Sequence, residues 1–128
     1  EPRLLSEKEL RDVRSRSTRL GAFLNPVRGL EDVTRIATAH CEAFDGSGCP
    51  DGLSGTSIPL GARLIAVCDT FDALTSRRPH RAARDTSLAI DILIRGSGGM
   101  FDPDVVSAAV PVFLISNPAE EDRVPAWA

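Results

Sequence analysis

Apolar residues recur at helical spacing along most of the chain, and no stretch alternates between apolar and polar residues as a half-buried strand would. A capping box at Ser6–Glu9 predicts a first helix that ends at Asn25-Pro26. A second helix is predicted from Leu30 to about Ala43. Its expected buried stripe consists of Val33, Ile36, Ala37 and His40.

The segment that follows Pro59 gives the most informative pattern. Pro59 occupies a first-turn position, and the helix expected over residues 60–76 is apolar on nearly every face, which predicts that it is buried. Asp69 falls on a face of small residues, where a carboxylate is costly to desolvate unless it is paired, hydrogen-bonded or bound to a metal. The two apolar faces consist of Leu60, Leu64, Val67, Phe71 and Leu74, and of Ala62, Ile65, Ala66 and Ala73.

Two further helices are expected toward the C-terminal end. The fourth is capped at Asp85 or Thr86 and ends at Gly96, because a cap residue precedes the apolar pattern and glycine follows it. The fifth opens at Asp102-Pro103, and Pro111 predicts a kink or an end within it.

The composition is that of one globular domain, with 128 residues, 42% apolar and 26% charged. We therefore predict an all-α helical bundle of about five helices over residues 1–116 and a flexible tail over residues 117–128. No apolar run approaches the roughly 20 residues that cross a bilayer, and the net charge of −3 gives no general attraction to nucleic acid or membranes. Three cysteines, an odd number, are typical of reduced cytoplasmic thiols rather than a disulfide framework.

The stretch HCEAFDGSGCPDG, which begins at His40, contains the densest group of chemically active side chains. One interpretation is a zinc site built from His40, Cys41 and Cys49 with Cys68 or Asp69, although short paired Cys-x-x-Cys spacing is lacking. A glycine loop that cradles a phosphate is a second interpretation, and a turn-rich connection is a third. His40 also continues the apolar stripe of its helix, as a core histidine bonded to Asp69 would.

The longer string HCEAFDGSGCPDGLSGTSIPLGARLIAVCDTFDALTSRRPHR, from His40 to Arg81, resembles the second half of HD-GYP domains. These are all-helical, metal-dependent phosphohydrolases of bacterial signalling that hydrolyse cyclic di-GMP. Residues 6–24 and 99–103 resemble a ligand-bearing helix and a later Phe-Asp-Pro helix start of the family, so that the resemblance covers roughly residues 5–114. The matching signature positions are Glu42, Asp45-Gly46-Ser47-Gly48, Pro50, Asp69, Phe71-Asp72-Ala73 and Arg78-Pro79.

The resemblance implies roles for particular side chains. His40 and Asp69 match metal-ligand positions, with Cys41 as a substitute ligand, and the metals of the family are iron, manganese or magnesium. The loop from Asp45 to Gly55 matches the part of the family that contacts partner signalling domains. The residues of the signature loop are Glu42, Asp45, Gly46, Gly48 and Pro50.

A basic segment over residues 77–84 is the place where a phosphate contact is expected. Arg78 and Arg81 are the candidates to bind the phosphates of a cyclic dinucleotide. A solvated helix end is the alternative interpretation of the same charges. We expect no direct contact with nucleic acid and none with a membrane.

Several positions depart from the family pattern. No His-Asp dipeptide occurs in the chain, and in the family this pair precedes the matched region and supplies metal ligands. Cys41 replaces the second histidine of a His-His-Glu triplet, Ser17 replaces a histidine of the first helix, and Cys49 replaces the signature tyrosine. His80 and Ala82 replace a tyrosine and a lysine of the later turn.

Two interpretations of the function follow. The first is a degenerate HD-GYP-type domain, a cytoplasmic regulatory module without full catalytic activity, whose metal is absent or partly retained and whose exposed apolar faces favour a homodimer. The second is the C-terminal part of an active cyclic di-GMP phosphodiesterase, whose other ligands and N-terminal helices lie in a segment before Glu1. Two or three ligand positions do not hold a two-metal centre, so we expect the chain itself to be inactive.

Overall fold

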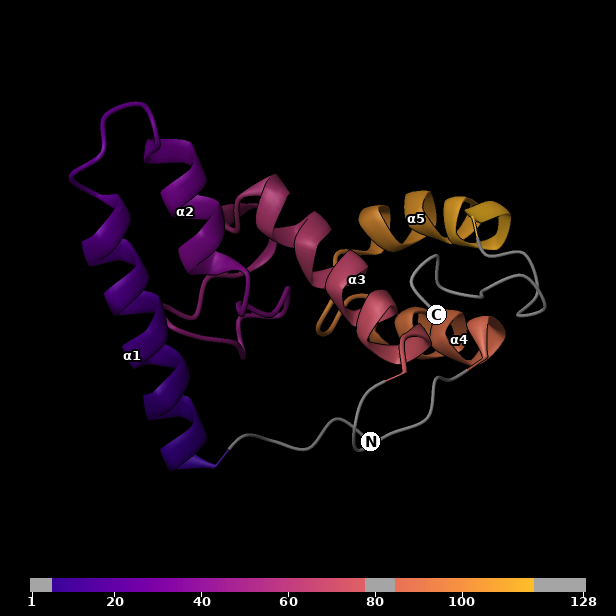
Figure 1. Cartoon of the computed structure of the whole chain (residues 1–128). Coiled ribbons are helices and arrows are strands. Elements are labelled where there is room, and N and C mark those ends of the chain that lie inside the picture. Colours follow the sequence, from indigo (N-terminus) through magenta and orange to yellow (C-terminus); the bar gives the residue numbers. More distant parts are fainter. Residues whose placement is uncertain (1–5, 78–84, 117–128) are drawn as a thin grey trace.

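A computed structural model describes residues 6–77 and 85–116 of the chain (Figure 1). The expected all-α fold of about five helices is confirmed, and the β structure within these ranges is limited to one isolated bridge between Ser97 and Phe101. The expected tail over residues 117–128 lies outside the described residues. The elements are α1 (Glu7–Leu24), α2 (Glu31–Ala39), the 3-10 turn η1 (Gly55–Ser57), α3 (Leu60–Thr75), α4 (Thr86–Gly96) and α5 (Pro103–Ser116).

Helices α1 and α2 form one antiparallel pair at one end of the molecule (Figure 1). The predicted capping box at the start of α1 is confirmed, because the Ser6 hydroxyl accepts from the Glu9 amide and the Ser6 amide donates to the Glu9 carboxylate at 2.8 Å. Ser17 and Gly21 are the buried residues of α1. The pair packs against the rest of the fold through α2, which contacts α3 as well as α1.

The predicted end of α2 is wrong, and its predicted buried stripe is wrong at Val33, while Ile36 does pack against a core. The helix ends at Ala39 and not near Ala43, because the next residues turn inward to build a loop around Glu42. Thr34 and Ala39 are its buried residues, whereas Val33 is exposed. The buried phase of α2 is set by contacts with α1 and α3 on two sides, and a single apolar stripe does not reveal such a position.

Helix α3 runs through the middle of the described fold and joins two apolar cores (Figure 1). The smaller core lies between α2, the loop and the first turn of α3, with Ala39, Ile58 and Ala62 at its centre. The larger core lies between the second half of α3, α4 and α5, and there Phe71 stacks on Phe113 with ring centroids 3.9 Å apart. The members of the larger core are Val67, Phe71, Leu74, Ala89, Ile90, Leu93, Phe101, Val105 and Val106.

The prediction that α3 is buried on nearly every face is wrong for the described residues. Leu60, Leu64 and Ile65 are 55%, 44% and 41% exposed, and Asp69 is exposed as well. The elements that pack on α3 are α2, α4 and α5, and they leave one side of the helix open. The expected desolvation cost of the Asp69 carboxylate therefore does not arise in this arrangement.

Helices α4 and α5 confirm the expected starts, with Asp85 at the N-cap of α4 and Pro103 at the first position of α5. Pro111 does not end α5, which continues to Ser116. Within the described residues, no helix is both long and apolar enough to cross a membrane.

Candidate functional site

Glu42 organises the loop that follows α2. Its side chain is buried, and its two carboxylate oxygens accept from the backbone amides of Asp51 at 2.7 Å and of Leu53 at 3.2 Å. A buried carboxylate needs such donors, and loop amides need such acceptors, so each satisfies the other. The sequence placed Glu42 in a signature but did not indicate this structural role.

The backbone of the loop passes very close to itself at Gly48. A Cβ atom added there would lie 2.2 Å from the Ala43 nitrogen, so only glycine fits this position. Gly46 has φ +87°, which is the left-handed region that glycine adopts readily. The peptide bond between Cys49 and Pro50 is cis. Three of the predicted signature positions thus shape the backbone of the loop.

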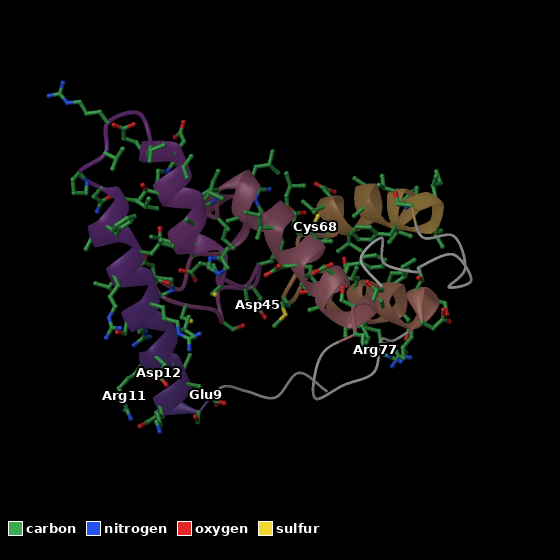
Figure 2. All side chains as sticks on the ribbon, viewed as in Figure 1. Glu9, Arg11, Asp12, Asp45, Cys68 and Arg77 are labelled. Atoms are coloured by element: carbon green, nitrogen blue, oxygen red, sulfur yellow. The ribbon has the colours of Figure 1, made fainter. Side chains whose placement is uncertain are left out.

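The loop is also tied to the turn between α4 and α5. The Phe44 amide donates to the Met100 carbonyl at 3.2 Å, and the Asp45 amide donates to the Gly99 carbonyl at 2.9 Å. The Asp45 carboxylate accepts from the Ser47 hydroxyl and, at 2.9 Å, from the Ser47 amide, and these bonds hold the pKa of Asp45 below its usual range. Asp45 itself is exposed, and Figure 2 labels it.

His40 lies at the C-terminal end of α2 and is half-buried. Its Nδ1 atom is 2.6 Å from the Ala37 carbonyl oxygen, so the ring bonds to its own helix and not to Asp69. A carbonyl partner fixes Nδ1 as the donor, which leaves Nε2 as the lone-pair nitrogen. Metal-binding histidines often donate their other ring nitrogen to a carbonyl in this way, and helix-terminal histidines make the same bond without any metal.

Cys41 lies within electrostatic range of Asp69, so the structure brings together a residue of the loop and one of α3. The residue is exposed, but partial desolvation of its sulfur raises the pKa of the Cys41 thiol, and Cys49, Glu42 and Asp69 raise it further. The guanidinium of Arg16, from α1, acts in the opposite direction.

Cys49 faces inward, with 2% of its surface exposed. Burial and then the Glu42 carboxylate raise the pKa of its thiol, while Arg14 of α1 acts to lower it. A partner that contacts the surface of the loop would therefore meet other side chains and not Cys49.

The three predicted ligand positions do not assemble a metal site by themselves. Within residues 6–77 and 85–116, no group of three or more histidine, cysteine or acidic side chains is placed to hold a metal ion. Among these residues, therefore, the side chains present do not by themselves form a centre with three or more ligands, whether the one that the resemblance implies or a zinc site that combines His40 with the cysteines. Cys68 is exposed on α3, where Figure 2 labels it.

The basic segment is only partly described. Arg77 is exposed just after α3, where Figure 2 labels it. Arg78 and Arg81, the predicted phosphate contacts, lie outside the described residues, as do His80 and Ala82.

A buried ion pair beside the loop was not predicted from the sequence. The Arg63 guanidinium donates to the Asp102 carboxylate at 2.7 Å and, through Nε, to the Ile58 carbonyl at 2.9 Å. Asp102 also caps α5 by accepting from the Asp104 amide at 2.8 Å. Burial acts to raise the pKa of Asp102, but the bonds from Arg63 and from the amides of Asp104 and Val105 outweigh it and hold the pKa below its usual range.

Part of this pair had a signal in the sequence. An aspartate before proline at a predicted helix start indicates an N-cap, so one role of Asp102 was readable. Its partner Arg63 lies in the first turn of α3, 39 residues earlier in the chain. The spacing of residues in a sequence does not predict an ion pair between positions so far apart.

A family match and two curated relatives point to the same kind of protein. The sequence matches a family described as "HD domain" over residues 2–105. It is 43% identical over 110 residues to the cyclic di-GMP phosphodiesterase response regulator RpfG of Xanthomonas campestris pv. campestris, covering 84% of this chain and 29% of the relative. It is 35% identical over 107 residues to the 3'3'-cGAMP-specific phosphodiesterase 3 of Vibrio cholerae, covering 84% of this chain and 23% of the relative.

The fold has a solved counterpart. The crystal structure of a cyclic GMP-AMP specific phosphodiesterase of V. cholerae, V-cGAP3, superposes with a TM-score of 0.69 at 24% identity, covering 89% of this chain and 26% of that one. At this identity the likeness concerns the fold alone. The chain spans about a quarter of the length of these relatives.

Proposed function

Because the chain belongs to the HD-domain family, in its HD-GYP form, we propose that it is a regulatory or signalling module without full hydrolytic activity of its own. It is related to phosphodiesterases of cyclic dinucleotides, a family that uses divalent metals. The observation that carries the proposal is the contrast between a well-built signature loop and an incomplete ligand set among the described residues.

The scaffold supports the proposal through the residues that it retains. Glu42, Gly46 and Gly48 maintain the shape of the loop by hydrogen bonding and close backbone contact. By contrast, Asp69 stands exposed near the thiol of Cys41, and the described residues group no three such side chains around a metal position. A domain in this state can transmit binding or contact signals while lacking the ligands that activate water for attack on phosphorus.

A turnover assay tests the proposal. The purified chain is incubated with cyclic di-GMP and Mn²⁺ or Fe²⁺, and the linear product is followed by chromatography. We expect no metal-dependent turnover, and none from Cys41→His, which restores one ligand type at an exposed position. Metal-dependent hydrolysis by the unmodified chain would contradict the proposal.

One observation favours a second candidate function, that of the C-terminal part of an active phosphodiesterase. The Nδ1 bond of His40 to the Ala37 carbonyl leaves Nε2 free, as a preorganised ligand would be. In that case a longer protein that includes the preceding segment hydrolyses cyclic di-GMP, and His40→Ala abolishes its activity with little loss of stability. If the longer protein is inactive, this candidate is excluded. If it is active and His40→Ala lowers stability but leaves activity unchanged, His40 is excluded as a ligand.

Two contacts are proposed for the regulatory module. The loop from Asp45 to Gly55, which is exposed at Ser47 and Asp51, is the proposed surface for a partner signalling domain. The open side of α3, with Leu60 and Leu64, is the proposed face for a second copy of the chain. Light scattering of the chain and of Leu64→Glu tests the second contact, because a dimer through this face dissociates in the variant, and a monomeric parent chain rules the contact out.

A further inference from the structure

The two ends of the signature loop run side by side at its two cysteines. The Cys49 amide donates to the Cys41 carbonyl at 3.4 Å. The next contact is tighter still, since a Cβ on Gly48 would lie 2.7 Å from the Glu42 Cα and 2.2 Å from the Ala43 nitrogen. The backbone around Cys41 is therefore held directly against the backbone around Cys49.

This spacing suits a disulfide. The hydrogen bond from the Cys49 amide to the Cys41 carbonyl keeps the two residues adjacent in space, and disulfides join residues whose Cα atoms are about 4.4–6.8 Å apart. Desolvation is the largest cause of the raised pKa of the Cys41 thiol, and Cys49 is the next. Both cysteines are free thiols in the structure, and Cys68 is not among the groups that affect either of them.

The accessibility of the pair is unequal in a useful way. Cys41 is exposed and can meet a small oxidant in solution, whereas Cys49 is buried beneath the loop. An exposed thiol can be oxidised first and a sheltered neighbour can then resolve it. Because the raised pKa of Cys41 leaves little thiolate at neutral pH, the first step is slow and needs an excess of oxidant.

We propose that Cys41 and Cys49 are a modification site, at which a two-electron oxidant such as hydrogen peroxide forms an intramolecular disulfide. The Cys41 sulfur attacks one peroxide oxygen, the O–O bond breaks, and a sulfenic acid and water result. The Cys49 sulfur then attacks the Cys41 sulfur, the S–O bond breaks, and hydroxide leaves with the Cys49 proton as a second water. Two thiols are oxidised, one peroxide is reduced to two waters, and an added dithiol reverses the change.

The bond would clamp the signature loop at a second point. Glu42 already holds the Asp51 and Leu53 amides from the residue next to Cys41. A disulfide from Cys41 to Cys49 adds a covalent bond between the same two stretches of backbone and limits how far they can separate. The proposal does not depend on whether the chain binds a metal or hydrolyses a nucleotide.

Peptide mapping of the whole chain tests the proposal. Trypsin cleaves after Arg35 and Arg63, so one peptide carries Cys41 and Cys49 together, while the next carries Cys68. The chain is treated with peroxide, alkylated with iodoacetamide and digested. We expect the peptide of residues 36–63 to become about 2 mass units lighter and to resist alkylation, and the peptide that follows to be alkylated once. Dithiothreitol treatment before alkylation should restore two alkylation sites in the first peptide.

Matched variants separate this outcome from general oxidation. Cys68→Ser should form the disulfide as the parent chain does, whereas Cys41→Ser and Cys49→Ser should not. Circular dichroism checks that each variant keeps its helices. The proposal is overturned if Cys41 proceeds to sulfinic acid while Cys49 remains open to alkylation. It is equally overturned if the oxidised product is a disulfide-linked pair of chains on a non-reducing gel.

Discussion

Glu42 has a structural role that its place in a family signature does not reveal. Its carboxylate is buried and accepts from two loop amides, those of Asp51 and Leu53. The residue type was readable from the sequence, but its partners at Asp51 and Leu53 were not. Those partners depend on a backbone path that only the folded loop defines.

Substitution of Glu42 tests this role. Glu42→Ala removes the acceptor of two amides, and each lost acceptor costs about 1–3 kcal/mol, so we expect the free energy of unfolding to fall by about 2–6 kcal/mol. Glu42→Gln retains one acceptor oxygen and should lose roughly half as much. Urea denaturation followed by circular dichroism measures both. Equal stability of the parent chain and Glu42→Ala would show that the loop amides find other partners.

The candidate ligands show how far residue-level prediction reached. The match to a family motif singled out His40, Cys41 and Asp69, and the structure does bring Cys41 near Asp69. It turns His40 toward Ala37, and it leaves Asp69 on the open side of α3. A motif gives residue types in order along the chain, but the direction of a side chain depends on neighbours that the motif does not contain.

Among the elements, the helices were predictable and the loop was not. Capping residues and helical spacing located α1, α4 and α5, because those signals act within a few residues of each helix end. The early end of α2 and the open side of α3 were missed. Both depend on contacts between elements, and apolar periodicity does not say which elements are present to cover a face.

The close backbone contact in the loop provides a test at the scale of an element. Gly48→Ala introduces a Cβ against the Ala43 nitrogen, and we expect a loss of about 1–3 kcal/mol or more in the free energy of unfolding. Gly21→Ala is the matched control, since its Cβ meets only ordinary contacts, the nearest at 3.6 Å from Thr38. That change should leave stability the same or raise it by up to about 1 kcal/mol through helix propensity.

The outcome is read by urea denaturation of both variants under identical conditions. A Gly48→Ala variant as stable as Gly21→Ala would mean that the loop relaxes around the added methyl group. The close backbone contact at Gly48 would then not hold the loop rigid.

For the molecule as a whole, the ion pair of Arg63 and Asp102 links the start of α3 to the start of α5. Both side chains are largely buried, at 15% and 5% exposed. We expect Arg63→Met to lower the free energy of unfolding by about 3–5 kcal/mol, because it leaves the Asp102 carboxylate buried without its charge partner. The exposed pair of Arg95 with Asp91 is the control, and Arg95→Met should cost at most about 1 kcal/mol. Similar losses in the two variants would contradict this role of the buried pair.

The pH dependence of stability follows from the same pair. The pKa of Asp102 is lowered on folding, so its contribution is complete above its unfolded value of about 3.9 and is lost as the pH falls toward the folded pKa. In Arg63→Met the hydrogen bond and the charge of Arg63, which both lower that pKa, are lost, so Asp102 is protonated more easily than in the parent chain. We therefore expect the stability difference between the parent chain and Arg63→Met to narrow below about pH 4.

Denaturation curves at pH 7, 5, 4 and 3 measure this difference. The pKa of Asp45 is also lowered, but its carboxylate bonds to Ser47 and not to Arg63 or Asp102. Asp45 should therefore contribute equally to the stability of both proteins. A difference that stays constant down to pH 3 would exclude Asp102 as the group responsible.

This HD-GYP scaffold keeps its signature loop, yet its described residues bring no three candidate metal ligands together. Elemental analysis of the purified chain, after incubation with iron and manganese and removal of free metal by gel filtration, tests this most directly. We predict well under one metal ion per chain, with no change when His40 is replaced by alanine. One or more iron or manganese ions per chain, lost in His40→Ala, would contradict it.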